Sequence, residues 1–79
     1  MPVDYDSDTP PYQQIADKLR GRIERGDLQP GQRLPSITQL SQEYGVARVT
    51  SVKALKLLAE EGLIVSRPGW GNFVRREDR

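Results

Sequence analysis

The stretch that decides the fold of this chain is residues 36–55, SITQLSQEYGVARVTSVKAL. Ser36 has the side chain of a helix cap, and Gly45 accepts the left-handed conformation in which helices often end. Between them the apolar residues recur at helical spacing: Ile37, Leu40 and Tyr44. The pattern predicts a short amphipathic helix that stops at a tight glycine turn.

A second and longer helix is predicted directly after this turn, from about Arg48 to Glu61. Val46 lies between the two helices and is expected to pack inward, and Gly62 closes the second helix. The apolar residues of this helix again recur at helical spacing: Ala54, Leu55, Leu58 and Ala59. Two helices joined by such a turn are typical of a helix-turn-helix, predicted here over about residues 37–56.

Another helix is predicted upstream, from Tyr12 to a stop at Gly26. Its apolar residues form one helical face: Tyr12, Ile15, Ala16, Leu19 and Ile23. A turn at Pro30-Gly31 follows, because proline fixes φ and glycine accepts a positive φ. A short extended piece over residues 32–34 comes next, because the residue before Pro35 is restricted toward β geometry.

The period changes after Gly62, where two runs of β-branched and aromatic residues, 63–67 and 72–75, are separated by Pro68-Gly69-Trp70-Gly71. This pattern predicts a β-hairpin, a wing over about residues 63–75. The predicted fold is α+β, a winged helix-turn-helix with the element order α-β-α-α-β-β, over residues 11–75.

The two ends of the chain differ from its middle. Residues 1–10 are acidic (Asp4, Asp6 and Asp8), hold two prolines and show no apolar period, so they are expected to form a flexible lead-in. Residues 76–79 are expected to be a linker-like tail. Residues 11–76 hold eleven Lys/Arg and six Asp/Glu, so their formal net charge is about +5, compared with +1 for the whole chain. This charge suits a polyanion, although from charge alone an ordinary mixed surface is equally compatible.

Composition excludes several classes of protein. Seventy-nine residues predict one small domain, and the lack of cysteine excludes disulfides and thiolate metal sites. With no histidine, the four serines of the predicted domain lack the usual activating base: Ser36, Ser41, Ser51 and Ser66. We therefore expect no enzyme and no cofactor. No apolar run approaches the length of a membrane span, so we expect no membrane partner and a cytoplasmic location.

Candidate DNA-binding residues lie at the start of the longer helix, where a helix-turn-helix presents side chains to base edges. Arg48 could pair with a guanine edge, Thr50 with a phosphate or base, and Val49 with a thymine methyl group; Lys53 follows one turn on. The alternatives are a solvated arginine, a capping threonine and a core valine. DNA is favoured for Arg48, because a cation at the positive end of a helix needs an anion nearby.

The hairpin tip is the second candidate, because a tryptophan between two glycines is hard to bury within its own loop. Trp70 could lie along a groove wall while the Gly69 backbone approaches a phosphate or the minor groove. The alternative is that Trp70 folds back onto the hairpin.

Beyond these patterns, the chain resembles the GntR family of bacterial transcription regulators over residues 11–74. The matching residues occur in order at fixed spacings: Pro11-Tyr12-Gln13-Gln14-Ile15, Leu19-Arg20, Ile23, Gly26, Leu28, Pro30-Gly31, Arg33-Leu34-Pro35-Ser36, Leu40, Gly45-Val46, Arg48, Thr50, Ala54-Leu55, Leu58, Glu61-Gly62-Leu63, Gly69, Gly71 and Phe73-Val74. The resemblance implies a regulator, usually a repressor, that binds a short inverted-repeat operator as a dimer. It places DNA contacts on Ser36, Arg48, Thr50 and Gly69.

The chain departs from the family pattern at three places on the predicted DNA-binding surface. Thr38 stands where the family commonly has arginine, and it is kept as a candidate contact. Ala47 replaces the serine or threonine that caps the recognition helix. Ser51-Val52 replaces Val-Arg, so the second recognition arginine is absent, and Lys53 is the alternative cation, about 100° further around the helix.

The resemblance also implies a C-terminal domain that binds an effector and forms the dimer, which these residues do not include. We expect an excised DNA-binding domain rather than a short natural variant, with no small-molecule ligand of its own. It would dimerise on DNA only with that missing domain or by cooperative binding to adjacent half-sites. The alternative function is a winged-helix module that binds protein through Trp70 and Tyr12.

Overall fold

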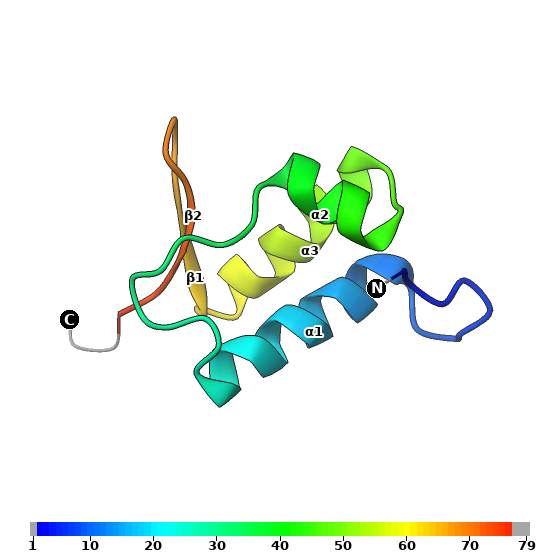
Figure 1. Ribbon diagram of the computed structural model, residues 1–79, viewed down its shortest axis with the longest axis horizontal. Helices are drawn as coiled ribbons and strands as arrows, with labels where there is room; N and C mark the ends of the chain where they lie inside the picture. Colours follow the sequence, from blue (N-terminus) through cyan, green and yellow to red (C-terminus); the bar gives the residue numbers. More distant parts are fainter. Residues whose placement is uncertain (1, 77–79) are drawn as a thin grey trace.

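The computed structural model describes residues 2–76, which form three helices and a two-stranded antiparallel hairpin (Figure 1). The elements follow in this order: α1 (Pro11–Arg25), α2 (Ile37–Tyr44), α3 (Arg48–Glu60), β1 (Ile64–Arg67) and β2 (Gly71–Val74). α3 packs against both α1 and α2, and the hairpin continues from its C-terminal end. This arrangement confirms the predicted α+β winged helix-turn-helix. None of the helices described is long and apolar enough to cross a membrane.

The helix boundaries follow from the residues at their ends. Pro11 occupies the first position of α1, where a missing N–H costs no hydrogen bond. Gly26 and Gly45 end α1 and α2 with φ angles of 87° and 67°, a conformation that a Cβ disfavours. α3 ends at Glu60, one residue earlier than predicted, and Gly62 turns the chain into the hairpin with φ of 80°.

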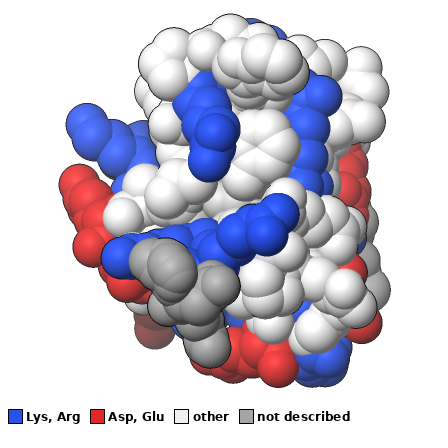
Figure 2. Space-filling view, turned by 90° about the vertical axis from the view of Figure 1, so that its left-hand side faces the viewer, with Lys and Arg blue, Asp and Glu red and all other residues white. Residues whose placement is uncertain are grey.

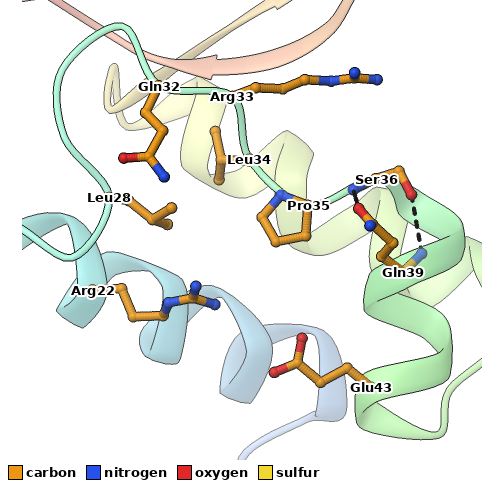
Figure 3. A pocket seen from close by; sticks show the side chains of 9 residues that line it. All are labelled: Arg22, Leu28, Gln32, Arg33, Leu34, Pro35, Ser36, Gln39 and Glu43. Carbon is orange, nitrogen blue, oxygen red and sulfur yellow. Dashed lines mark hydrogen bonds between the residues drawn. The ribbon is translucent and has the colours of Figure 1, made fainter.

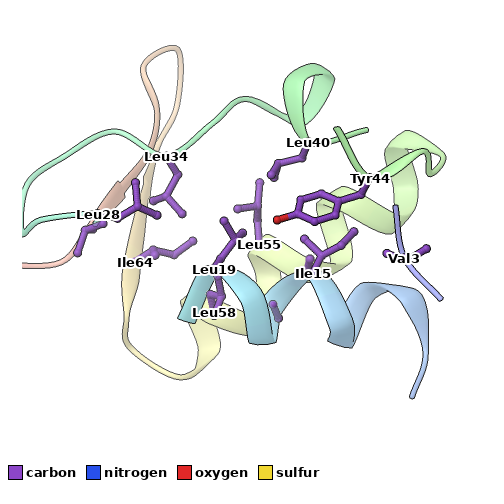
Figure 4. Close-up of a cluster of buried hydrophobic side chains, with 13 residues drawn as sticks. Val3, Ile15, Leu19, Leu28, Leu34, Leu40, Tyr44, Leu55, Leu58 and Ile64 are labelled. Atoms are coloured by element: carbon purple, nitrogen blue, oxygen red, sulfur yellow. The ribbon is translucent and has the colours of Figure 1, made fainter. Parts of the chain in front are cut away.

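The core lies where the inward sides of the three helices meet the base of the hairpin (Figure 4). Its buried apolar residues are Val3, Ile15, Ala16, Leu19, Leu28, Leu34, Leu40, Tyr44, Ala54, Leu55, Leu58, Ile64 and Val74. The predicted apolar stripes therefore point inward, with one correction: Ala59 is exposed, because α3 buries only the side centred on Ala54 and Leu58. Burial raises the pKa of Tyr44, since its ionised form would lose hydration.

The wing is a four-residue ladder that runs from the pair Ile64–Val74 to the pair Arg67–Gly71. The loop after α1 lies along β2. The amide of Val74 donates to the carbonyl of Gln32 and the amide of Leu34 to the carbonyl of Asn72, both at 2.8 Å. The strand predicted over residues 32–34 is thus reduced to a single bridge between Arg33 and Phe73. This loop nonetheless covers the edge of β2 and ties the wing to the helices.

An ion pair joins α1 to the end of α3. Arg20 donates two hydrogen bonds to the carboxylate of Glu61, at 3.0 and 2.8 Å, and a third to Asp17 at 2.6 Å. The hydrogen bonds to Glu61, followed by the one to Asp17, raise the pKa of Arg20. Because two parallel bonds fix both the distance and the orientation of the charged groups, this pair adds to the apolar packing that holds α1 against α3.

Residues 2–10 differ from the flexible lead-in expected from the sequence, because they make defined contacts with the helix-turn-helix. Val3 is only 7% exposed and belongs to the core. Its amide donates to the carbonyl of Tyr44, and the hydroxyl of Tyr5 donates to the carbonyl of Gly45 at 3.1 Å. A single buried valine produces no apolar period, so the sequence pattern did not reveal this packing.

Gln14 of α1 adds a second attachment for the same segment. Its side chain accepts a hydrogen bond from the amide of Asp4 and donates to the carbonyls of Asp4 and Thr9. The backbones of Asp4 and Thr9 are therefore held beside α1. At the other end of the chain, residues 77–79 of the predicted tail 76–79 lie outside the described residues.

We expect Val3→Ala to lower the free energy of unfolding by about 2 kcal/mol, because it removes two buried methyl groups and leaves a cavity. Urea denaturation followed by circular dichroism measures the change. Val49→Ala is the matched control: it removes the same atoms from a side chain that is 64% exposed. It should change the free energy by less than about 0.5 kcal/mol. Equal effects from the two substitutions would contradict the packing of Val3 in the core.

Candidate nucleic-acid interface

The start of α2 is held by a reciprocal capping box. The Oγ atom of Ser36 accepts a hydrogen bond from the amide of Gln39 at 3.1 Å, and the Oε1 atom of Gln39 accepts one from the amide of Ser36 at 2.8 Å. Figure 3 shows this pair at one end of an open groove of about 650 Å³, with Arg22 and Glu43 along its other side. The predicted cap is confirmed, and it fixes the first turn of α2.

Arg48 connects the beginnings of the two helices of the helix-turn-helix. Its Nη1 atom donates to the Oγ1 atom of Thr38 at 2.9 Å. Two of the candidate residues, ten positions apart in the sequence, are therefore brought into direct contact. Since a hydroxyl is neutral, this bond orients the guanidinium without cancelling its charge.

The wing also lies next to Thr38 and Arg48. Ser36, Thr38 and Arg48 line a hollow of about 250 Å³ together with Arg33 and with the wing residues Gly71 and Asn72. A Cβ atom on Gly71 would lie 2.9 Å from the Nε atom of Arg33, so this side chain passes close to the glycine, whose φ of 118° is itself a conformation that a Cβ disfavours. Sequence analysis did not propose Arg33 as a site residue. The available signal was its place beside the inward-pointing Leu34, which directs Arg33 outward.

The tip of the wing carries the other two candidates. Gly69 has φ of 81°, and the amide of Trp70 donates to the carbonyl of Arg67 at 2.9 Å to close the turn. The side chain of Trp70 is 72% exposed, so it does not fold back onto the hairpin. Gly69 and Trp70 do not line the hollow around Arg48; they are exposed at the tip of the wing.

The remaining candidates lie on α3 itself and differ in exposure. Val49 is 64% exposed, which excludes the core role that was its alternative, whereas Thr50 is half-buried. The Nζ atom of Lys53 lies 4.6 Å from the centre of the Tyr12 ring. Lys53 thus extends toward α1 and makes a cation–π contact there, one turn along the helix from Val49.

Basic residues gather on the wing side of the molecule. Figure 2 shows the face at the left of Figure 1, where Lys and Arg side chains cross the middle and acidic side chains lie toward the edges. On the hairpin, Arg67, Arg75 and Arg76 line a hollow of about 290 Å³. Within residues 2–76 no three metal-ligating side chains come together. The middle of this face carries positive charge.

One buried polar contact was missed by sequence analysis. Ser51 of α3 is fully buried, and its Oγ atom lies 3.0 Å from the Oγ atom of Ser41 on α2. This hydrogen bond crosses the interface between the two helices of the helix-turn-helix. Together with the apolar packing of Leu55 and Leu58, it restrains how α3 is turned about its own axis, because a rotation of either helix would separate the two hydroxyls.

A braced helix with an exposed, basic first turn, flanked by a hairpin on the same side, defines a winged helix-turn-helix DNA-binding domain. Residues 11–74 match the family model described as "Bacterial regulatory proteins, gntR family". The chain belongs to the GntR family. The resemblance deduced from the sequence is thereby confirmed.

Three similar proteins illustrate the relationship. The mannosyl-D-glycerate transport/metabolism system repressor MngR of Escherichia coli is 46% identical over 86% of this chain. The structure of YtrA from Sulfolobus acidocaldarius, a GntR-family transcription factor, superposes with a TM-score of 0.87 at 41% identity, covering 95% of this chain and 79% of YtrA. The AraR DNA-binding domain in complex with operator ORX1 has a TM-score of 0.83 at 34% identity, covering 94% and 88%.

The curated relative MngR is a much longer protein than this chain. The chain spans 28% of the length of MngR. The similarity therefore supports the assignment of the winged-helix domain. It does not identify the ligands of the rest of these relatives.

The hydroxyl pair between α2 and α3 is testable by a double-mutant cycle. Ser41→Ala should lower the free energy of unfolding by about 1–3 kcal/mol, because it leaves the buried hydroxyl of Ser51 without its partner. Ser51→Ala should cost a similar amount, and the double substitution should cost less than the sum of the two. Urea denaturation of the four proteins provides the measurement. Strictly additive losses would mean that the two hydroxyls do not interact.

Proposed function

We propose that this chain is the DNA-reading head of a bacterial transcription regulator, a repressor that binds an inverted-repeat operator as a dimer. The observation that carries the proposal is the convergence of Arg48, Thr38 and Arg33 with the wing residues Gly71 and Asn72 around one hollow. A relative of this fold, the AraR DNA-binding domain, has been solved with operator DNA. The alternative of a protein-binding module has no comparable support.

The candidate residues divide into those that contact bases and those that contact the DNA backbone. Arg48 pairs with a guanine edge in the major groove, with Thr38 holding its guanidinium. Ser36, Thr50 and Lys53 contact phosphates at the rim, and Val49 contacts a thymine methyl group. At the wing, the Gly69 backbone approaches a phosphate and the Trp70 ring lies along a groove wall. Arg33 joins them as a phosphate contact between the wing and α2.

The remaining parts of the proposal concern the larger protein. Dimerisation would come from a C-terminal domain of the kind the family carries, or from cooperative binding to adjacent half-sites. We propose binding rather than catalysis, because the relatives described above are named as regulators. No small-molecule ligand is assigned to these residues, and the cytoplasm is the proposed location because operator DNA lies there.

Arg48→Ala and Lys53→Ala should weaken DNA binding in different ways. The first should cost about 1–3 kcal/mol and relax the base preference at one operator position, because a base contact is lost. The second should weaken binding to all sequences about equally and reduce the salt slope by about 1, because one phosphate contact is lost. Fluorescence anisotropy on selected and scrambled duplexes over a range of salt concentrations measures both effects.

One control accompanies this experiment. Lys53 also contacts Tyr12, so the unfolding transition of Lys53→Ala must be recorded to confirm that the protein stays folded at the assay temperature. Wild-type affinity that changes neither with salt nor with sequence would contradict the proposed function. Equal, sequence-independent losses from both substitutions would contradict the division of roles between them.

A further inference from the structure

Two valines stand on the outer side of α3, where a helix in water ordinarily carries polar residues. Val49 is 64% exposed and Val52 is 42% exposed. Valine is also a weaker helix former than alanine or lysine. Single exposed apolar side chains are common, but two at a spacing of three residues form one continuous apolar strip.

The orientation of α3 places Val52 on the side that carries Arg48. Successive residues of a helix are turned by about 100°, so Val52 projects well away from the buried Ser51 and lies four residues beyond Arg48, on the same side. Arg48 is in turn directed to the hollow beneath the wing by its bond to Thr38. Val52 therefore follows Arg48 along the proposed DNA-binding face, one turn deeper.

The cation next to Val52 in the sequence does not lie on its side of α3. Lys53 extends to the Tyr12 ring on α1. A valine opposite a guanine or cytosine would cover polar base atoms without returning a hydrogen bond, which is unfavourable. The apolar group that a base edge offers in the major groove is the C5-methyl group of thymine.

We propose that Val52 is a specificity-determining residue that selects thymine by contact with its C5-methyl group, next to a second thymine contacted by Val49. The side chains of residues three apart on a helix lie about 5–6 Å apart at Cβ, which corresponds to one to two base-pair steps at about 3.4 Å each. This inference rests on the proposed DNA-binding function and adds to it the base chemistry at one operator position.

Selection of bound duplexes from a random pool tests the assignment, using the 79-residue chain and its Val52→Ala and Val52→Arg variants. We expect the wild-type pool to be enriched in thymine at a defined position. Val52→Ala should lose the preference at that position alone, and Val52→Arg should replace it with guanine. Identical base preferences from wild type and Val52→Ala would overturn the inference while leaving the proposed function intact. A wild-type pool with no enriched sequence would overturn both.

A methyl deletion on the DNA side gives an independent readout. Deoxyuridine in place of the selected thymine removes only the C5-methyl group, so wild-type affinity should fall about fourfold, the factor for one unburied methyl group. Val52→Ala should bind the two duplexes equally. Val49→Ala, the matched control, should still respond at the thymine of Val52 and lose its response at the neighbouring one. A wild-type protein that binds both duplexes equally would overturn the inference.

Discussion

The buried side of α3 packs against α1 and α2 and determines how this helix is turned about its own axis. Leu55 and Leu58 fill the centre of the core, and Ser51 adds a directional bond to Ser41 that apolar packing alone does not provide. Because this side is held in place, the opposite side of α3, which carries Val49 and Val52, always faces solvent. The base preferences of the domain thus depend on contacts that never touch DNA.

Local sequence signals were sufficient for the secondary structure. The helices and the hairpin are predictable from apolar residues at helical spacing, from the glycines at positions 26 and 45, and from the β-branched and aromatic runs on either side of the wing tip. The sequence predicts a strand over residues 32–34 where the structure has a single bridge. The reason is that a residue before proline is extended whether or not it pairs with another strand. Ala59 was assigned to the core because periodicity does not say where the apolar side of a helix ends.

The site was less predictable, since it depends on pairs of side chains distant in the sequence. The residues at the start of α3 and at the wing tip were recognisable from type and position, and Val49 and Trp70 are exposed as a contact role requires. The contact of Lys53 with Tyr12 joins α3 to α1, and the passage of Arg33 past Gly71 joins a loop to the wing. Such contacts depend on how the helices and the wing pack against one another, and a local sequence pattern does not predict this packing.

The attachment of the first residues to the helix-turn-helix has a consequence for folding. The bond from Tyr5 to Gly45 closes a loop of 40 residues, and the carbonyl that it reaches takes its position only when α2 has ended. Contacts of such long range raise the contact order and form late. The cooperative folding unit therefore begins at least eight residues before Pro11, where the family match starts. A shortened chain that began at Pro11 would lack the segment whose hydrogen bonds hold the turn between α2 and α3.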